Sequence, residues 1–183
     1  MEKHWIRRPE AVIHFFDRSL TIITPAKCGS SSLHVALCTA EIGGMFAVGH
    51  KDLNKHTNEL PYEATLDGWQ VAVLVRNPYD RAASLYRHSV EEGDSYLTFD
   101  QFIESVLLPR EDPFSHPISE KYSGYSRYWK IEHIDDCLSD FGFSVSVPVI
   151  NKSKIKAVVT EKHAQMLRDW ANPDCEAFNY ELR

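Results

Sequence analysis

The stretch TIITPAKCGSSSLHVAL, residues 21–37, begins with the pattern of a strand and ends with the pattern of a helix. The apolar, β-branched run at residues 20–23 is typical of a buried strand. From Leu33 to Ala40, apolar residues recur at the spacing of a helix with one apolar face. The turn between them contains one lysine, one glycine and three consecutive serines, residue types that can form a turn and can also bind a ligand.

This turn has the residues of an anion-binding loop. The backbone N–H groups and the dipole at a helix N-terminus both favour negative charge. Gly29 would let the backbone approach a ligand closely, and Lys27 would add a positive charge. The hydroxyls of Ser30, Ser31 and Ser32 would add donors. The alternative is an ordinary N-cap by Ser30 or Ser31, with Lys27 in solvent. The loop is not a Walker A motif, because Lys27 precedes the glycine instead of following it.

Length and composition indicate an ordinary globular protein. We expect one domain, residues 1–183, with 43% hydrophobic and 25% charged residues. A net charge of -6 argues against a nucleic-acid partner. No segment has the length of a membrane span, and the N-terminus lacks the apolar region of a signal peptide, so we expect no membrane partner and a cytoplasmic location. The four cysteines form no C-x-x-C pair, so we expect no zinc site.

Strand and helix patterns alternate along the chain. Strands are expected at residues 12–16, 20–23, 46–48, 71–75 and 145–150. Helices are expected to follow the first anion loop and at residues 78–92, 98–108, 129–142 and 160–171. Such alternation predicts an α/β fold with a mostly parallel sheet.

A second candidate anchor lies in VLVRNPYDRAASLYRH, residues 73–88, where Arg76 ends a buried strand. Ligands collect at the carboxyl ends of strands in an open parallel sheet, so Lys27 and Arg76 are expected to converge. An arginine with a nearby serine, here Ser84, suits a phosphate group. The alternative is a structural salt bridge made by Arg76.

Taken together, these motifs resemble a known family. PAKCGSSSL, residues 25–33, resembles the 5'-phosphosulfate loop of sulfotransferases that use 3'-phosphoadenosine 5'-phosphosulfate (PAPS). RNPYDRAASLY, residues 76–86, resembles their 3'-phosphate motif. VPVINKSK and DWANPDCEAFNY, residues 147–154 and 169–180, resemble closing segments of the carbohydrate branch, which includes uronyl and heparan sulfate 2-O-sulfotransferases. The resemblance implies a three-layer, P-loop-like nucleotide-binding fold. The chain departs from the carbohydrate branch in being short and in lacking the membrane anchor and lumenal disulfides of Golgi members, so we expect a compact, soluble enzyme of bacterial or viral origin.

The resemblance also assigns roles to residues. PAPS is the expected co-substrate and PAP the product, with no metal. Arg76 and Ser84 would hold the 3'-phosphate. Lys152, Ser153 and Lys154 would close over the nucleotide, unless they form a solvated basic loop. The 5'-phosphosulfate would lie on Lys27, Cys28, Gly29, Ser30, Ser31 and Ser32.

The expected reaction is in-line transfer of a sulfuryl group to a hydroxyl of a carbohydrate or small glycoconjugate. Lys27 would act as a catalytic residue by neutralising the leaving phosphate, and His50 resembles the family's general base. His56 and Glu59 are the alternatives for the base. Acceptor loops are expected at residues 56–68 and 108–129.

Two other functions stay open at this point. They are a kinase-like phosphotransferase and a non-catalytic nucleotide-binding domain. The missing Walker A motif argues against the first, and a binding module would need no base. The sequence indicates no oligomeric state.

Overall fold

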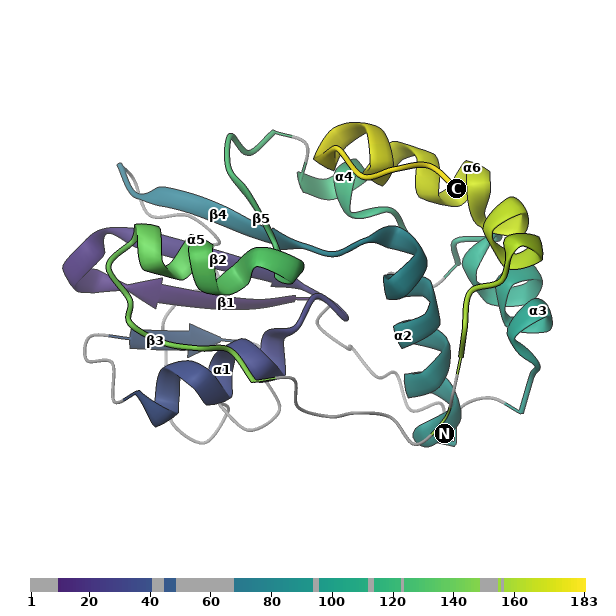
Figure 1. Cartoon of the computed structure of the whole chain (residues 1–183), viewed down its shortest axis with the longest axis horizontal. Helices are drawn as coiled ribbons and strands as arrows, with labels where there is room; N and C mark the ends of the chain where they lie inside the picture. Colours follow the sequence, from purple (N-terminus) through teal and green to yellow (C-terminus); the bar gives the residue numbers. More distant parts are fainter. Residues whose placement is uncertain are drawn as a thin grey trace.

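A five-stranded mixed sheet forms the centre of the computed structural model (Figure 1). The structure describes residues 10–40, 45–48, 68–93, 96–111, 114–122, 124–148, 155 and 157–183. The strand order is β3-β1-β2-β4-β5. The strands are β1 (Glu10–Phe15), β2 (Leu20–Pro25), β3 (Met45–Val48), β4 (Gln70–Val75) and β5 (Tyr128–Lys130).

The α/β class is confirmed, but the sheet is only partly parallel. Strands β2, β4 and β5 pair in parallel, whereas β1 is antiparallel to both of its neighbours, β2 and β3. Only the 3-10 turn Phe16–Arg18 and Ser19, at φ 47°, separate β1 from β2. So short a connection makes a hairpin, which pairs strands antiparallel. The predicted mostly parallel sheet is therefore wrong for the pairings of β1.

The helices follow the strands in the expected alternation. Their bounds are α1 (Ser30–Thr39), α2 (Pro78–Glu91), α3 (Phe99–Phe102) with a π-helical continuation (Ile103–Leu107), α4 (Ile118–Tyr122), α5 (Ile134–Asp140), which follows a 3-10 turn (Ile131–His133), and α6 (Glu161–Phe178). None of the helices in the described ranges is both long and apolar enough to cross a membrane.

Side-chain caps fix where three of these helices begin. The Asn77 side chain accepts hydrogen bonds from the N–H groups of Tyr79 and Asp80, at 3.1 and 3.4 Å, with Pro78 in the first turn of α2. Thr160 and His163 form a capping box at the start of α6. The predicted capping box of Thr98 and Gln101 is confirmed at α3.

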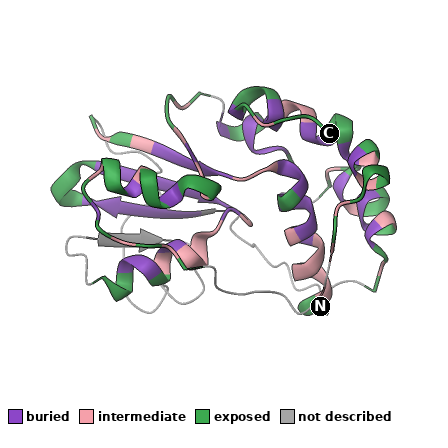
Figure 2. Ribbon diagram, in the orientation of Figure 1, coloured by how far each residue is buried: buried purple, intermediate pink, exposed green. Residues whose placement is uncertain are grey.

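The core consists of two clusters that share α6. All six residues of β2 are buried, as are Ala72–Val75 of β4, so the sheet is covered on both faces at its centre (Figure 2). The second cluster lies among α2, α3 and α6, which pack together (Figure 1). Phe178 of α6 belongs to the sheet cluster and Trp170 to the helical one.

Two predicted elements differ from the structure. Residues 128–130 form β5, where a helix was expected from residue 129, and α5 begins only at Ile134. The indole of Trp129 is buried in the sheet cluster, and burial against the sheet decides the conformation here. Residues 145–148 form no strand; the Asp135 carboxylate instead accepts hydrogen bonds from the Val147 N–H and the Ser146 hydroxyl, at 2.8 and 2.9 Å.

Candidate functional site

The loop between β2 and α1 has an unusual backbone. Lys27 and Gly29 both have positive φ, 66° and 88°, in the left-handed region that glycine adopts most readily. A Cβ atom on Gly29 would also lie 2.6 Å from the Cδ1 atom of Ile131. The positive φ of Gly29 and the close approach of Ile131 therefore both require glycine at position 29. The close approach of Ile131 shows that the segment after β5 packs directly on the loop.

Gly29, and not a serine, is the N-cap of α1. The helix begins at Ser30, and no side chain caps it. The alternative prediction, in which Ser30 or Ser31 forms an ordinary N-cap, is therefore wrong. The hydroxyl of Ser30 has no hydrogen-bond partner within the described part of the chain. The N-terminus of α1 thus opens onto the loop without a capping side chain, as an anion site requires.

Arg76 joins the two predicted anchors. Its Nη1 atom donates a hydrogen bond to the carbonyl oxygen of Lys27, at 3.2 Å, so the carboxyl ends of β4 and β2 meet as expected. The predicted alternative, a structural salt bridge, is not observed for Arg76 among the described residues. The half-buried Lys27 ammonium also has no ion-pair partner in those ranges.

Lys27 and Arg76, which have no ion-pair partner among the described residues, repel each other. Burial lowers the pKa of Lys27, and the nearby positive charge of Arg76 lowers this pKa further. Glu91 and Glu92 act in the opposite direction, but these effects are smaller. A bound anion would offset both the desolvation and the repulsion.

Ser84 lies on α2, three residues after Arg81, and is half-buried. Its hydroxyl has no hydrogen-bond partner among the residues that the structure describes, and no contact with Arg76 is observed there. Its assignment to the 3'-phosphate stays a prediction.

Arg81 has a structural role. Its buried guanidinium donates to the carbonyl oxygens of Ala26, Phe114 and His116, at 3.4, 2.8 and 3.0 Å. Burial lowers the pKa of this arginine. Arg81 therefore holds the segment around residues 114–116 against the start of the anion loop.

Cys28 faces the core. Its thiol is fully buried in the sheet cluster, and its N–H donates to the Pro25 carbonyl oxygen at 3.1 Å. Burial raises the pKa of Cys28 to about 12, so the thiol stays protonated. Neither group is available to a ligand, which argues against the predicted binding role of Cys28.

The sequence analysis missed Glu132, which follows β5. One carboxylate oxygen accepts the Asn77 N–H at 3.0 Å, and the other accepts the Tyr180 hydroxyl at 2.9 Å. The pKa of Tyr180 is raised by burial and by the negative charge of Glu132. Lys130 lies 4.3 Å from the centre of the Tyr180 ring and donates to the Asn179 carbonyl oxygen at 2.7 Å. Strands β2, β4 and β5 thus place Lys27, Arg76 and Glu132 near one edge of the sheet.

The aromatic pair Tyr128–Trp129 was the signal that could have revealed β5, and with it Glu132, because aromatic residues favour strands. Six other predicted or alternative site residues lie outside the described residues: His50, His56, Glu59, Lys152, Ser153 and Lys154. Within the described ranges, no group of three or more histidine, cysteine or carboxylate side chains could hold a metal ion.

Comparisons of the chain with protein-family models, with curated proteins and with solved structures found no match. The chemistry of these residues and the motif resemblance are therefore the basis for a functional proposal. The contact between the ends of β2 and β4, with the two cations Lys27 and Arg76, is the central feature of the candidate site.

Proposed function

We propose that the protein is a sulfotransferase that moves a sulfuryl group from PAPS to a hydroxyl of a carbohydrate or small glycoconjugate. The observation that carries the proposal is the hydrogen bond from Arg76 to the Lys27 carbonyl, because it brings two motifs far apart in sequence to one place. The two motifs resemble, in residue type and in their order along the chain, the segments that hold the 5'-phosphosulfate and the 3'-phosphate in PAPS-dependent sulfotransferases. A nucleotide with phosphate groups at both ends fits such a pair of anchors.

Each anchor has a distinct role in this proposal. The N-terminus of α1, with Gly29 and the three serines that follow it, receives the 5'-phosphosulfate. Arg76 and Ser84 receive the 3'-phosphate, the arginine through its planar donor pair. Because neither Lys27 nor Arg76 forms an ion pair with another described residue, a bound polyanion would supply a counter-charge for both.

The chemistry asks for positioning and for stabilisation of charge. The acceptor oxygen bonds to sulfur as the bond from sulfur to the 5'-phosphate oxygen breaks, and PAP leaves with the electron pair. Lys27 stabilises the charge that builds on the leaving phosphate. His50 remains the proposed base. The three-layer, P-loop-like arrangement is likewise part of the proposal; the parallel units β2–α1 and β4–α2 are compatible with it.

Calorimetry with PAP, ADP and ATP tests the proposal directly. PAP should bind at least about tenfold more tightly than ADP, because a hydrogen bond to a charged group contributes roughly 1.5–3 kcal/mol. Equal affinities for PAP and ADP would contradict the 3'-phosphate site. A preference for ATP would favour the kinase-like alternative. Transfer from labelled PAPS to a panel of hydroxyl acceptors then separates an enzyme from a non-catalytic binding domain.

A further inference from the structure

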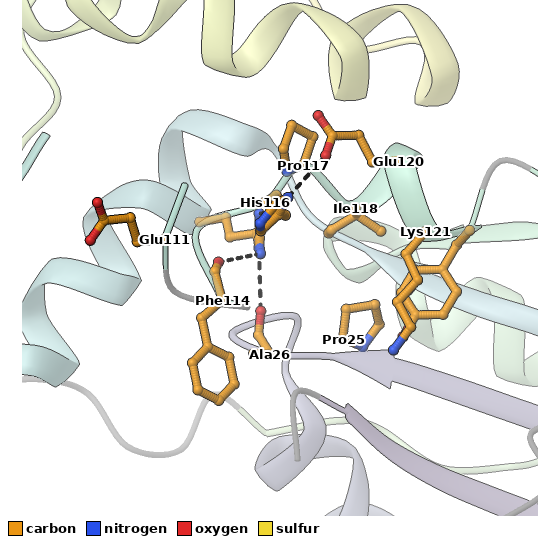
Figure 3. A pocket seen from close by; sticks show the side chains of 11 residues that line it. Pro25, Ala26, Glu111, Phe114, His116, Pro117, Ile118, Glu120 and Lys121 are labelled. Carbon is orange, nitrogen blue, oxygen red and sulfur yellow. Dashed lines mark hydrogen bonds and ion pairs between the residues drawn. The ribbon is translucent and has the colours of Figure 1, made fainter. Parts of the chain in front are cut away.

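A pocket of about 460 Å³ opens beside the anion loop (Figure 3). Its walls come from the end of β2, from Arg81 of α2, from Glu111 and from residues 114–122, which belong to a segment predicted to bind the acceptor. Small-molecule sites typically measure about 300–1,000 Å³. The volume therefore suits one small ring compound.

The pocket adjoins the place where the sulfuryl group would lie. Pro25 and Ala26 form one wall, and Ala26 immediately precedes Lys27. Consecutive Cα atoms are about 3.8 Å apart, so the wall at Ala26 lies next to Lys27, the proposed catalytic residue. Arg81 fixes the spacing of the two sides, because it donates to the carbonyl of Ala26 on one side and to that of His116 on the other.

His116 and Glu120 form a polar pair on the pocket wall (Figure 3). The Nδ1 atom of His116 lies 3.1 Å from Oε2 of Glu120, and Arg110 contacts the other oxygen of the same carboxylate. Because an ionised carboxylate can only accept a hydrogen bond, Nδ1 carries the proton. In the neutral ring, Nε2 then keeps its lone pair, and it forms no hydrogen bond with a residue in the described ranges. Nε2 can therefore accept a hydrogen bond from a ligand hydroxyl.

The remaining walls are mostly apolar. They include the rings of Phe114, Pro117 and Tyr122 and the side chain of Ile118. Flat apolar surfaces of this kind receive the face of a sugar or an aromatic ring.

We propose that this pocket is the acceptor site, and that it binds a small ring compound whose hydroxyl donates to Nε2 of His116. The inference rests on the proposed sulfuryl transfer, which it extends by naming where the acceptor binds and which group recognises it. Phenols and saccharides share this chemistry. Glu120 is a positioning residue, because it holds the imidazole in the tautomer that accepts.

Binding of two probes tests the site without any need for turnover. Saturation-transfer NMR is recorded with methyl β-glucoside and with 4-nitrophenol on the wild type and on three variants. His116→Leu removes the acceptor atom at similar size, His116→Gln keeps a side-chain acceptor, and His133→Leu is the control at an exposed histidine outside the pocket. We expect signal from at least one probe, its loss in His116→Leu, and its retention in the other two variants. The probe that binds identifies the source of the ring.

Transfer and nucleotide binding complete the test. If the wild type transfers sulfuryl groups, His116→Leu should raise the acceptor KM roughly twofold to tenfold, the cost of one hydrogen bond of ordinary strength, with PAP affinity unchanged. Binding of neither probe, or equal binding by wild type and His116→Leu, would overturn the acceptor site even if PAP binds. Failure of the wild type to bind PAP would instead overturn the proposed function, and the NMR result would still decide whether the pocket binds ring alcohols.

Discussion

The Nη1 atom of Arg76 lies 3.2 Å from the carbonyl oxygen of Lys27, and this contact joins the carboxyl ends of β4 and β2. The two residues are far apart in the sequence but lie side by side at the proposed nucleotide site. A positive φ at Lys27 turns its carbonyl group into reach of the guanidinium. The arginine therefore both shapes the loop and supplies charge to it.

Replacement of Arg76 by alanine should remove most of the preference for PAP over ADP. The variant loses a charge-assisted contact, so PAP affinity should fall roughly tenfold to a hundredfold while ADP affinity changes much less. Arg168→Ala is the matched control, because Arg168 is an exposed arginine on α6. Calorimetry on both variants checks the prediction. A similar loss for PAP and ADP in Arg76→Ala would show that the residue only supports the loop.

Replacement of Lys27 by methionine should lower turnover and raise stability. Loss of one group that stabilises transition-state charge lowers the rate by roughly 10²–10³. The free protein, however, buries the lysine charge beside Arg76, so its removal should raise the free energy of unfolding by roughly 1 kcal/mol, or about 2–4 °C in Tm. Stopped assays and thermal melts measure the two effects.

The expected gain in the free energy of unfolding of Lys27→Met should decrease as the pH rises. Because the folded protein lowers the pKa of Lys27, the lysine charge reduces the free energy of unfolding, and this loss of stability is complete below the lowered pKa. As the pH rises toward the ordinary lysine pKa, the loss of stability disappears. The stability difference between Lys27→Met and wild type should therefore shrink in alkali. A difference that is constant with pH would mean that burial of the apolar methionine side chain, and not relief of charge, stabilises the variant.

Local patterns in the sequence predict much of this site and less of its surroundings. The strand–turn–helix unit around Lys27 and the Asn77–Pro78 start of α2 are encoded by residues next to one another, so both could be predicted. Strand β5 depends on burial of Trp129 against the sheet, which periodicity does not reveal. Glu132 is found only through its contacts with Asn77 and Tyr180, since nothing local distinguishes it from any other exposed glutamate.

Replacement of Gly29 by alanine should destabilise the protein more than the same change at Gly93. Both glycines have positive φ, 88° and 74°, which costs an alanine about 1–2 kcal/mol. Only at Gly29 would the new Cβ meet a neighbour, Ile131, and overpacking adds roughly 1–3 kcal/mol. Urea unfolding of both variants gives the difference between their free energies of unfolding. Adding Ile131→Ala to Gly29→Ala should reduce that difference. An equal loss of stability in the two Gly→Ala variants would show that the Ile131 side chain moves aside freely.

The Glu132–Tyr180 hydrogen bond should contribute measurably to stability. We expect a coupling free energy of roughly 1 kcal/mol in a double-mutant cycle of Glu132→Gln and Tyr180→Phe, because a charged acceptor strengthens the bond while its exposure weakens it. Urea unfolding of the four proteins gives this value. Additive effects would show that Tyr180 packs beside Glu132 without an energetically useful bond.

Alkaline pH tests the same pair in a different way. The pKa of Tyr180 is raised in the folded protein by burial and by Glu132, so the folded state retains this proton above pH values of about 10, where an unfolded tyrosine loses it. The resulting stability is full below that pH and is lost as the pH rises further. Wild type should therefore lose stability relative to Tyr180→Phe above about pH 10. Melts between neutral and alkaline pH, with tyrosinate absorbance recorded alongside, follow both quantities. Glu132 also accepts a hydrogen bond from the Asn77 N–H, next to Arg76. If residues 179–183, which follow α6, support the nucleotide site, PAP affinity should fall together with stability as the pH rises. If they do not, PAP affinity should stay constant.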